Sequence, residues 1–308
     1  MRRFAVSVTA SMVKELREKT GAGMMDCKKA LTESDGDMAK AVDLLRKKGL
    51  SAAAKKSDRA IAEGMILSAE NDNKGVLVEI NAETDFVAKN DQFVDFANKV
   101  AQVALENLPA DVETLKTLPF PGTGRNISDE LTNLIATIGE NMDVRRYVGM
   151  EVGSGIVAAY IHAGGKIGSM VQLSTDKGDN EELQVMARQL AMHVAAASPQ
   201  YLKREDVPAD VVEQEKEIMR AKARESGKPD QIIEKIIEGQ INKFFGEICL
   251  LEQAYVIDPD HKVGKIVESL AKSIGADVEL TGYSRLELGE GVEKKQDDFA
   301  SEVADLAK

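Results

Sequence analysis

Aromatic residues and cysteines are scarce in this chain. It contains no tryptophan, and aromatic residues make up only 4% of its 308 positions. Its hydrophobic cores must therefore be built mostly from aliphatic side chains. The two cysteines, Cys27 and Cys249, are far apart and have no paired spacing. Neither a disulfide framework nor a zinc site is indicated, and we expect reduced, buried thiols in a cytoplasmic protein.

Long apolar runs are also missing. No stretch approaches the roughly 20 apolar residues that a membrane-spanning helix needs. Residues 1–8 include Arg2, Arg3 and Phe4, but they lack the roughly 7–15-residue apolar segment of a signal peptide. We therefore expect a cytoplasmic chain with no membrane partner.

Catalytic, metal-binding and cofactor-binding motifs are absent or poorly supported. Residues 153–158 match the glycine spacing of dinucleotide-binding loops, but the β-branched run 156–161 predicts a strand where that motif needs a helix. His162, His193 and His261 have no metal-binding spacing, and no Ser/His/Asp or Cys/His order suggests a nucleophile. His193 lies on an apolar helix and is expected to pack in a core. We expect no enzyme, no catalytic residue, no bound metal and no cofactor.

Charge is distributed unevenly along the chain. The net charge of −12 argues against a general nucleic-acid binder, because affinity for phosphates comes from clustered Lys and Arg. Residues 1–60 nevertheless hold 14 Lys and Arg against 8 Asp and Glu, a balance of +6, so the remainder carries −18. A basic head on an acidic body indicates separate modules.

Residues 9–49 have the pattern of three short helices. Gly21 is placed to end the first helix, whereas Asp37 caps the third and Gly49 closes it. A bundle of about 40 residues is only marginally stable by itself. Residues 51–59, rich in Ala and Lys, are interpreted as a linker to the rest of the chain.

An internal repeat follows this linker. In the first copy, Gly64 opens a strand, a second strand spans 76–80, and a helix follows. In the second copy, Gly155 opens a strand, a second strand spans 168–173, and again a helix follows. The copies are offset by 91 residues from Gly64 to Gly155, by 93 from Gly75 to Gly168, and by 90 from Pro109 to Pro199 at the helix ends. Two copies of a hairpin followed by a helix are the simplest interpretation.

The two copies differ most between the second strand and the helix. Residues 84–89 of the first copy read Thr-Asp-Phe-Val-Ala-Lys, whereas residues 175–179 of the second contain no aromatic residue. Phe86 is predicted to lie in a polar surface loop, where it either folds back onto its own core or enters a partner. The second copy indicates that the scaffold can be built without a phenylalanine there, and both explanations stay open.

A helical hairpin is predicted after the second copy. Its arms span about 209–226 and 230–245. The second arm is richer in apolar residues than the first, so part of its surface needs cover. That cover is the body of the protein, a second copy of the chain in a homodimer, or another protein, and we favour the body. The remaining expected elements are a loop at 118–125, a helix at 127–141, a strand at 248–256, a helix at 263–274, a strand at 277–288, and a terminal amphipathic helix with Phe299, Val303 and Leu306.

Five segments of the chain resemble signatures of the translation elongation factor Ts family. The first, at 20–31, reads Thr-Gly-Ala-Gly-Met-Met-Asp-Cys-Lys-Lys-Ala-Leu, and the others are 84–89, 138–146, 191–196 and 289–294. The resemblance runs from about residue 9 to the end and includes the duplicated core and the hairpin. Residues 1–8 are longer than the usual start of the family, and the loop at 118–125 departs from its pattern.

The resemblance implies a function and a fold. The function is that of a guanine-nucleotide exchange factor, which binds elongation factor Tu, disrupts its magnesium and phosphate site and promotes GDP release during translation elongation. The fold is α+β, with a three-helix module resembling the ubiquitin-associated fold, a duplicated α/β core with antiparallel sheets, and an inserted coiled-coil hairpin. The implied domains are 1–58 (module and linker), 59–148 (first core half), 149–200 with 247–288 (second core half), 201–246 (hairpin) and 289–308 (carboxy-terminal module).

The resemblance also implies which residues contact the partner. The residues that dislocate the magnesium ion are Asp85 and Phe86, flanked by Thr84 and Val87. Further contacts are implied for Arg17, Met24 and Met25 in the three-helix module, and for His162 in the core. Met24 and Met25 have a second interpretation, as part of the core of the small bundle.

A second class of function stays open. The basic clusters at 46–48 and 55–56 are compatible with an RNA- or ribosome-associated protein acting through the basic module, although a charge run is usually a solvated face. Under the exchange-factor hypothesis, no direct contact with nucleic acid is expected.

Overall fold

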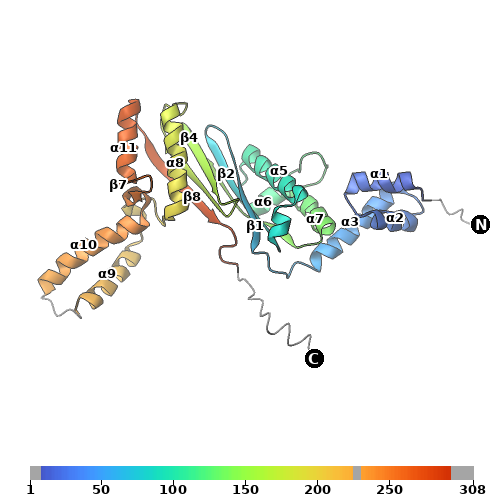
Figure 1. The fold of residues 1–308 in the computed structure, drawn as a ribbon, viewed down its shortest axis with the longest axis horizontal. Coiled ribbons are helices and arrows are strands. Elements are labelled where there is room, and N and C mark those ends of the chain that lie inside the picture. Colours follow the sequence, from blue (N-terminus) through green and yellow to red (C-terminus); the bar gives the residue numbers. More distant parts are fainter. Residues whose placement is uncertain (1–7, 225–229, 293–308) are drawn as a thin grey trace, which may run out of the picture. The chain divides into compact units, whose positions relative to one another are not determined.

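The computed structural model describes residues 8–224 and 230–292, which form two compact units (Figure 1). One unit contains the described residues up to 66, residues 78–147 and those from 288 onward. The other contains residues 67–77 and 148–287. Within the described residues, no helix is long and apolar enough to cross a membrane.

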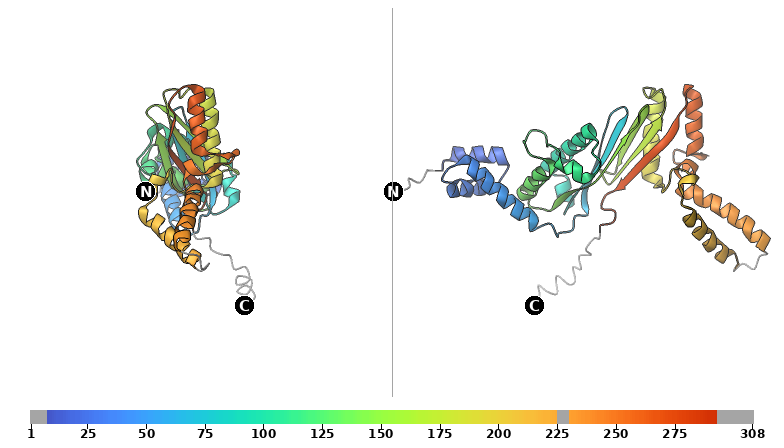
Figure 2. Two further views of the ribbon diagram at one scale, coloured as in Figure 1. Left: turned by 90° about the vertical axis from the view of Figure 1, so that its left-hand side faces the viewer. Right: turned by 180° about the vertical axis from the view of Figure 1, so that it is seen from behind.

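The first three helices pack into a small bundle (Figure 2). Thr9 caps the first of them by accepting a hydrogen bond from the backbone N–H of Met12, and Gly21 ends it with a φ of 69°, a conformation that favours glycine. Leu16 and Leu31 are fully buried in the bundle core. The bundle confirms the predicted three-helix pattern. The helices are α1 (Ala10–Thr20), α2 (Met24–Glu33) and α3 (Met38–Ala54).

The helix α3 continues past its predicted end. We expected Gly49 to close it, but the helix runs on to Ala54. A Cβ added to Gly49 would lie 3.4 Å from the Cβ of Ala136. The glycine therefore allows close packing of α3 against α7 (Ile127–Ile138), and this tertiary contact explains a buried glycine inside a helix. The first residues of the predicted linker are consequently helical.

The first three-stranded sheet has the order β1 (Glu63–Glu70), β2 (Lys74–Ala82) and β3 (Met142–Glu151). The strand β3 was not predicted, because its segment was interpreted only as a family signature. Between β2 and β3 lie α4 (Asp85–Ala88), α5 (Asp91–Asn107), α6 (Val112–Thr117) and α7. The helix predicted at 127–141 ends earlier, because Gly139 adopts a φ of 94°.

The loop at 118–125 is fastened to α5 through an aromatic pair. The rings of Phe96 and Phe120 are stacked with their centroids 5.3 Å apart, and both side chains are buried. The ammonium of Lys99 lies 5.7 Å from the centre of the Phe120 ring. This unusual loop therefore has a packing role within its own unit.

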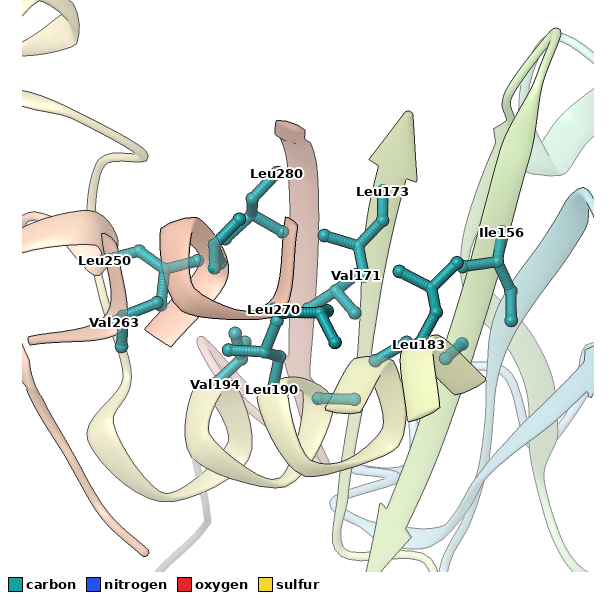
Figure 3. Packing of buried hydrophobic residues seen from close by; sticks show 14 of the residues in the cluster. Ile156, Val171, Leu173, Leu183, Leu190, Val194, Leu250, Val263, Leu270 and Leu280 are labelled. Atoms are coloured by element: carbon teal, nitrogen blue, oxygen red, sulfur yellow. The ribbon is translucent and has the colours of Figure 1, made fainter. Parts of the chain in front are cut away.

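The second sheet is antiparallel and has the order β4 (Gly155–His162), β5 (Ile167–Ser174) and β8 (Glu279–Glu287). The helices α8 (Glu181–Ala197) and α11 (Val263–Ile274) pack against one face of it, as Figure 3 shows. Their shared core is mostly aliphatic, as the scarcity of aromatic residues predicted, and Tyr255 is its buried aromatic member. It joins Val171 and Leu173 of the sheet, Leu183, Leu190 and Val194 of α8, and Val263 and Leu270 of α11.

The duplication is visible in two equivalent glycines. Gly64 has a φ of 127° and Gly155 a φ of 140°. A Cβ would lie 2.1 Å from the carbonyl oxygen of Ile80 at the first, and 2.0 Å from that of Leu173 at the second. Each glycine thus lets the opening strand approach the second strand of its own hairpin. The sheets, the helices and this repeated arrangement confirm the predicted α+β fold with a duplicated core.

The repeat extends further than the sequence predicted. In each half, a helix followed by a strand completes the sheet, namely α7 and β3 in the first half and α11 and β8 in the second. In both sheets this last strand pairs with the second strand of the hairpin. Each half is therefore a three-stranded sheet in the same order.

The helical hairpin consists of α9 (Ala209–Arg224) and α10 (Asp230–Ile248), which run side by side (Figure 2). We had favoured the body of the protein as cover for the apolar surface of the second arm. The first arm contacts the second, Ile233, Ile237 and Ile241 of the second arm are buried, and its Phe244 and Phe245 pack with Val207 and Cys249. At the base of the hairpin, Ile248 and Cys249 pack with Val207.

The segment after the hairpin differs from its prediction. A strand was expected at 248–256, but α10 extends through Ile248 and a short 3₁₀ helix follows at Leu250–Glu252. A second 3₁₀ helix, Arg204–Asp206, precedes the hairpin. The short strands β6 (Ala254–Tyr255) and β7 (Asp258–Lys262) pair before α11 begins. The predicted terminal helix with Phe299, Val303 and Leu306 lies outside the described residues.

Candidate functional site

The segment after β2 forms a single helical turn, α4, instead of the predicted loop. Thr84 caps this turn, because its hydroxyl oxygen accepts a hydrogen bond from the backbone N–H of Val87 at 3.4 Å. The side chain of Val87 is only 5% exposed and holds the turn against the first core half. The backbone N–H of Asn90 donates to the carbonyl of Val87, and Asn90 in turn caps α5. The turn is therefore anchored at both ends.

Phe86 is the most exposed of the large apolar side chains in the described residues. Its side chain is 80% exposed, compared with 64% for Met25. The ring therefore does not fold back onto its own core, which excludes one of the two explanations left open by the sequence. An aromatic ring presented to solvent on an anchored turn leaves apolar area available for a partner.

Asp85 lies beside this ring in an exposed ion pair. Its carboxylate contacts the ammonium of Lys89 at 2.7 Å, one helical turn away. Both side chains are more than half exposed. Exposed pairs of this kind contribute at most about 1 kcal/mol, so a partner can replace the lysine at small cost.

A carboxylate from a distant part of the chain holds the start of α4. The backbone N–H of Thr84 donates to Glu140 at 3.1 Å, and the Thr84 hydroxyl donates to the same carboxylate at 3.0 Å. Glu83, the neighbouring residue, accepts a hydrogen bond from the backbone N–H of Asn141. Reasoning from the sequence missed Glu140 and Glu83, although Glu140 belongs to the signature segment 138–146.

The candidate contacts of the three-helix module are all exposed. Arg17 projects from α1, and Met24 and Met25 occupy the first turn of α2 with 59% and 64% of their surfaces exposed. The alternative interpretation of the methionines as bundle core is therefore wrong for both. The bundle core is made instead by residues such as Leu16 and Cys27.

His162 belongs to the other unit, at the end of β4, and it is also exposed. Its Nδ1 lies 2.9 Å from the hydroxyl of Tyr160, and the two rings are tilted with centroids 5.9 Å apart. Tyr160 was not singled out from the sequence. It orients the imidazole, so that the remaining ring nitrogen faces away from this hydrogen bond.

The surroundings of the other histidines and of the cysteines indicate structural roles. His193 is buried, as predicted, and burial lowers its pKa, whereas the exposed His261 pairs with Asp258 at 2.8 Å. Both cysteines are buried, and burial raises the pKa of Cys27 and raises that of Cys249 to about 11. Within residues 8–224 and 230–292, no group of three or more His, Cys, Asp and Glu could hold a metal ion.

The glycine-spaced segment 153–158 leads into a strand. Gly155 opens β4, which pairs along its length with β5. A helix N-terminus that could face a pyrophosphate is therefore missing at this position. The prediction of a strand here is confirmed.

Comparison with known proteins identifies the family. Residues 83–290 match the family model for elongation factor TS. An elongation factor Ts from Syntrophotalea carbinolica is 63% identical over 303 residues, which cover 98% of this chain and 100% of that protein. The chain belongs to the elongation factor Ts family. Elongation factor Ts proteins from Magnetococcus marinus and Trichlorobacter lovleyi are 58% and 56% identical over 98% of this chain and 100% and 99% of their own lengths. The resemblance inferred from the signature segments is confirmed.

Proposed function

We propose that the chain is a guanine-nucleotide exchange factor that binds elongation factor Tu and promotes GDP release during translation elongation. In this role it catalyses no covalent chemistry of its own. Membership of the elongation factor Ts family supports this proposal. The structural observation that carries it is the 80% exposure of Phe86 on a turn whose neighbour, Val87, is buried.

The physical requirement for exchange is differential binding. A GTPase holds GDP through backbone amides, a lysine and a magnesium ion on the phosphates. A factor that binds the empty GTPase better than the GDP-bound form weakens GDP, and GDP weakens the factor by the same amount. Phe86 and Asp85 are the residues to which we assign this discrimination, with Thr84 and Val87 holding them in place.

Phe86 and Asp85 have different roles in the proposed mechanism. The Phe86 ring enters beside the magnesium site of the partner and displaces packed groups there. Packed interfaces have discrete arrangements, so a rigid ring shifts these groups from one arrangement to another. The Asp85 carboxylate disturbs the groups around the magnesium ion through its charge. A central aromatic anchor contributes roughly 2–4 kcal/mol, which corresponds to about a 30- to 1,000-fold change in an equilibrium.

Other exposed residues are proposed to hold the two proteins together. Met24 and Met25 offer flexible, polarisable apolar contacts, and the exposed side chain of Arg17 offers a cationic one. His162 contributes a contact from the second unit. These residues add affinity and orientation, whereas the discrimination between nucleotide states lies with α4.

The domain boundaries 1–58, 59–148, 149–200 with 247–288, 201–246 and 289–308 also remain proposals. A homodimer through the hairpin 201–246 is a further one. Ile218 and Ile232 are its main support, because they stay 41% and 48% exposed although the two arms pack together. The mass of the chain in solution, measured with and without the partner, tests this.

The proposed function is tested by release of a fluorescent GDP analogue from elongation factor Tu. The wild-type chain is expected to accelerate release, and Phe86→Ala is expected to reduce the acceleration at least about 30-fold. Val185→Ala is a matched control, because it trims another exposed apolar side chain, at 59% exposure, from α8. Release that is equally fast with Phe86→Ala and wild type contradicts the role of this ring.

The alternative, an RNA- or ribosome-associated protein, gains little support from the basic module. Within the cluster 46–48, Arg46 pairs with Asp129 at 3.1 Å and Lys48 pairs with Asp26. These partners lower the charge available to phosphates. Salt-sensitive RNA binding by the full chain, lost on neutralising the cluster, is the result that favours this alternative.

A further inference from the structure

The junction between Thr84 and Glu140 joins two loops of the first core half. One loop follows β2 and leads into α4, and the other follows α7 and leads into β3. Glu140 accepts two hydrogen bonds from Thr84, and Glu83 accepts one from the backbone of Asn141. Each loop therefore supplies one carboxylate to the backbone of the other. Hydrogen bonds to a charged acceptor are stronger than neutral ones.

The hydroxyl of Thr84 links Glu140 to the helical turn. A hydroxyl has one proton to donate and two lone pairs that accept. The proton is directed to Glu140 at 3.0 Å, so the oxygen presents a lone pair to the backbone N–H of Val87 at 3.4 Å. Glu140 thus selects the rotamer of Thr84 that caps α4, two residues before the exposed ring of Phe86.

The linkage is supported on its other side as well. Glu83 also contacts the guanidinium of Arg59 at 3.2 Å, and its side chain is only 20% exposed. The side-chain amide of Asn141 donates to the carbonyl of Arg59 at 2.9 Å, and Asn141 is buried. Neither loop can move away from the other without breaking several of these bonds.

The second core half uses the same junction differently. Its last helix, α11, ends at Gly275, as α7 ends at Gly139, and both glycines have positive φ values of 61° and 94°. Lys177, in the loop after β5, donates to the carbonyl oxygens of Ile274 at 2.7 Å and Gly275 at 3.2 Å. In both halves, the loop after the second strand is therefore hydrogen-bonded to the segment that ends the last helix. Among the described residues, only the first half adds a helical turn with an exposed aromatic ring to this loop.

We propose that Glu140 is a positioning residue for nucleotide exchange, which acts by holding the Thr84 cap and through it the orientation of Phe86. This inference rests on the proposed exchange function. Glu140 is half-buried and forms its described hydrogen bonds to Thr84, so its effect on exchange passes through α4. Removing it lets the turn sample other conformations, and a smaller fraction of encounters places the ring correctly.

The test measures release of a fluorescent GDP analogue from elongation factor Tu over a range of concentrations of the full-length chain. Glu140→Ala is expected to lower the maximal rate roughly tenfold, the scale of one lost hydrogen bond to a charged group. The concentration that gives half the maximal rate is expected to change less than about twofold, because the other contacts persist. Glu140→Gln keeps an acceptor for the Thr84 N–H and is expected to recover much of the rate.

The matched control is Glu106→Ala, which removes an exposed carboxylate with the same change of charge from α5 in the same half. It is expected to behave as wild type. Thermal unfolding of each variant checks the fold. Thr84→Val removes the hydroxyl but leaves the backbone N–H, and it replaces Glu140→Ala in this test if that variant does not fold. It is also expected to lower the maximal rate.

A double-mutant cycle with Phe86→Ala decides whether Glu140 acts through the ring. In the Phe86→Ala background, Glu140→Ala is expected to change the rate less than about twofold. A full, additive loss in that background, or a wild-type rate for Glu140→Ala alone, overturns the positioning role. If Phe86→Ala alone exchanges like wild type, the role assigned to the ring fails, and if the wild-type chain does not accelerate release, the proposed function itself fails, so these failures are distinguishable from that of Glu140.

Discussion

The Nε2 atom of His193 lies 3.0 Å from the side-chain oxygen of Gln253 in the core of the second unit. The other ring nitrogen, Nδ1, accepts a hydrogen bond from the backbone N–H of Val256 at 3.2 Å. The imidazole is therefore neutral, with its proton on Nε2. Gln253 completes the network by donating to the carbonyl of Glu247 at 2.8 Å.

This network predicts a dependence of stability on pH. Burial lowers the pKa of His193 in the folded state, below its ordinary value of 6.5. As the pH falls through about 6.5, the unfolded chain binds a proton that the folded chain does not, so stability declines with a slope of at most about 1.4 kcal/mol per pH unit. The decline stops below the pKa of the folded state. Above pH 7.5 the histidine is neutral in both states, so the protein has lost none of this stability.

Denaturant unfolding of wild type and His193→Gln, at several values between pH 7.5 and pH 5, measures how much His193 contributes to the pH dependence of stability. The wild-type chain is expected to lose more stability over this interval than the variant. Identical slopes for the two proteins contradict the prediction, whatever their absolute stabilities.

The two equivalent glycines predict a second pattern of stability. Gly155→Ala places a Cβ 2.0 Å from a carbonyl oxygen in a backbone conformation that favours glycine, and we expect a loss of about 2–3 kcal/mol or more. Gly64→Ala should cost a similar amount in the first half. Gly153→Ala is the control, because nothing lies within 4 Å of its added Cβ, and it should stay within about 0.5 kcal/mol of wild type. Thermal unfolding of the three variants checks whether Gly155→Ala and Gly64→Ala are much less stable than Gly153→Ala.

Glu79 is expected to be the most sensitive carboxylate of the first core half. It is fully buried in β2 and contacts Arg145 at 3.1 Å and also Arg146, while the backbone N–H of Gly289 donates to it at 2.9 Å. Glu79→Ala removes the buried acceptor that these groups share, although Arg146 keeps its pair with Glu290 at 2.9 Å, and we expect a loss of about 3–5 kcal/mol. Glu113→Ala removes an exposed carboxylate whose partner Lys116 keeps Asp143, and it should change stability by less than about 1 kcal/mol. Comparable losses in urea unfolding for both variants are the outcome that contradicts this.

The two cysteines are expected to be unreactive in the folded protein. Burial, together with the nearby Glu252 carboxylate, raises the pKa of Cys249 to about 11, and burial also raises the pKa of Cys27. At pH 7.5 both thiols are therefore protonated and shielded, whereas the thiolate is the reactive form. A thiol reagent should modify neither residue in the native chain and both in urea. Rapid native modification that mass spectrometry maps to Cys249 contradicts this.

Much of the fold was predictable because its signals are local. Gly21 ends α1 as expected, since a cap depends on residues within one helical turn. The repeat was found from corresponding points along the chain that are offset by 90 to 93 residues. In contrast, α3 passes its expected end at Gly49 because that glycine contacts Ala136, a residue far away in sequence. The strand β3 was missed because its alternation of buried and exposed residues is weak.

The candidate site also has one part that the sequence predicted and one part that it did not. The segment 84–89 was recognisable by its residues alone, and the contrast with the second copy singled out Phe86. Whether the ring was exposed could not be read from the sequence, because an aromatic residue in a polar segment is compatible with either outcome. The role of Glu140 could not be inferred either, although it lies in the signature segment 138–146, because its partner Thr84 lies 56 positions away.

The amino-acid sequence by itself determined the family, the duplication and the ends of many helices, because signatures, repeats and caps are encoded by neighbouring residues. The tertiary structure alone decided that Phe86 points to solvent, that Glu140 holds the Thr84 cap, and that Glu79 gathers two signature segments around one buried carboxylate. These features depend on which distant segments the folded backbone brings together. Burial and hydrogen bonding between such segments are properties of the three-dimensional packing, and no local pattern specifies them.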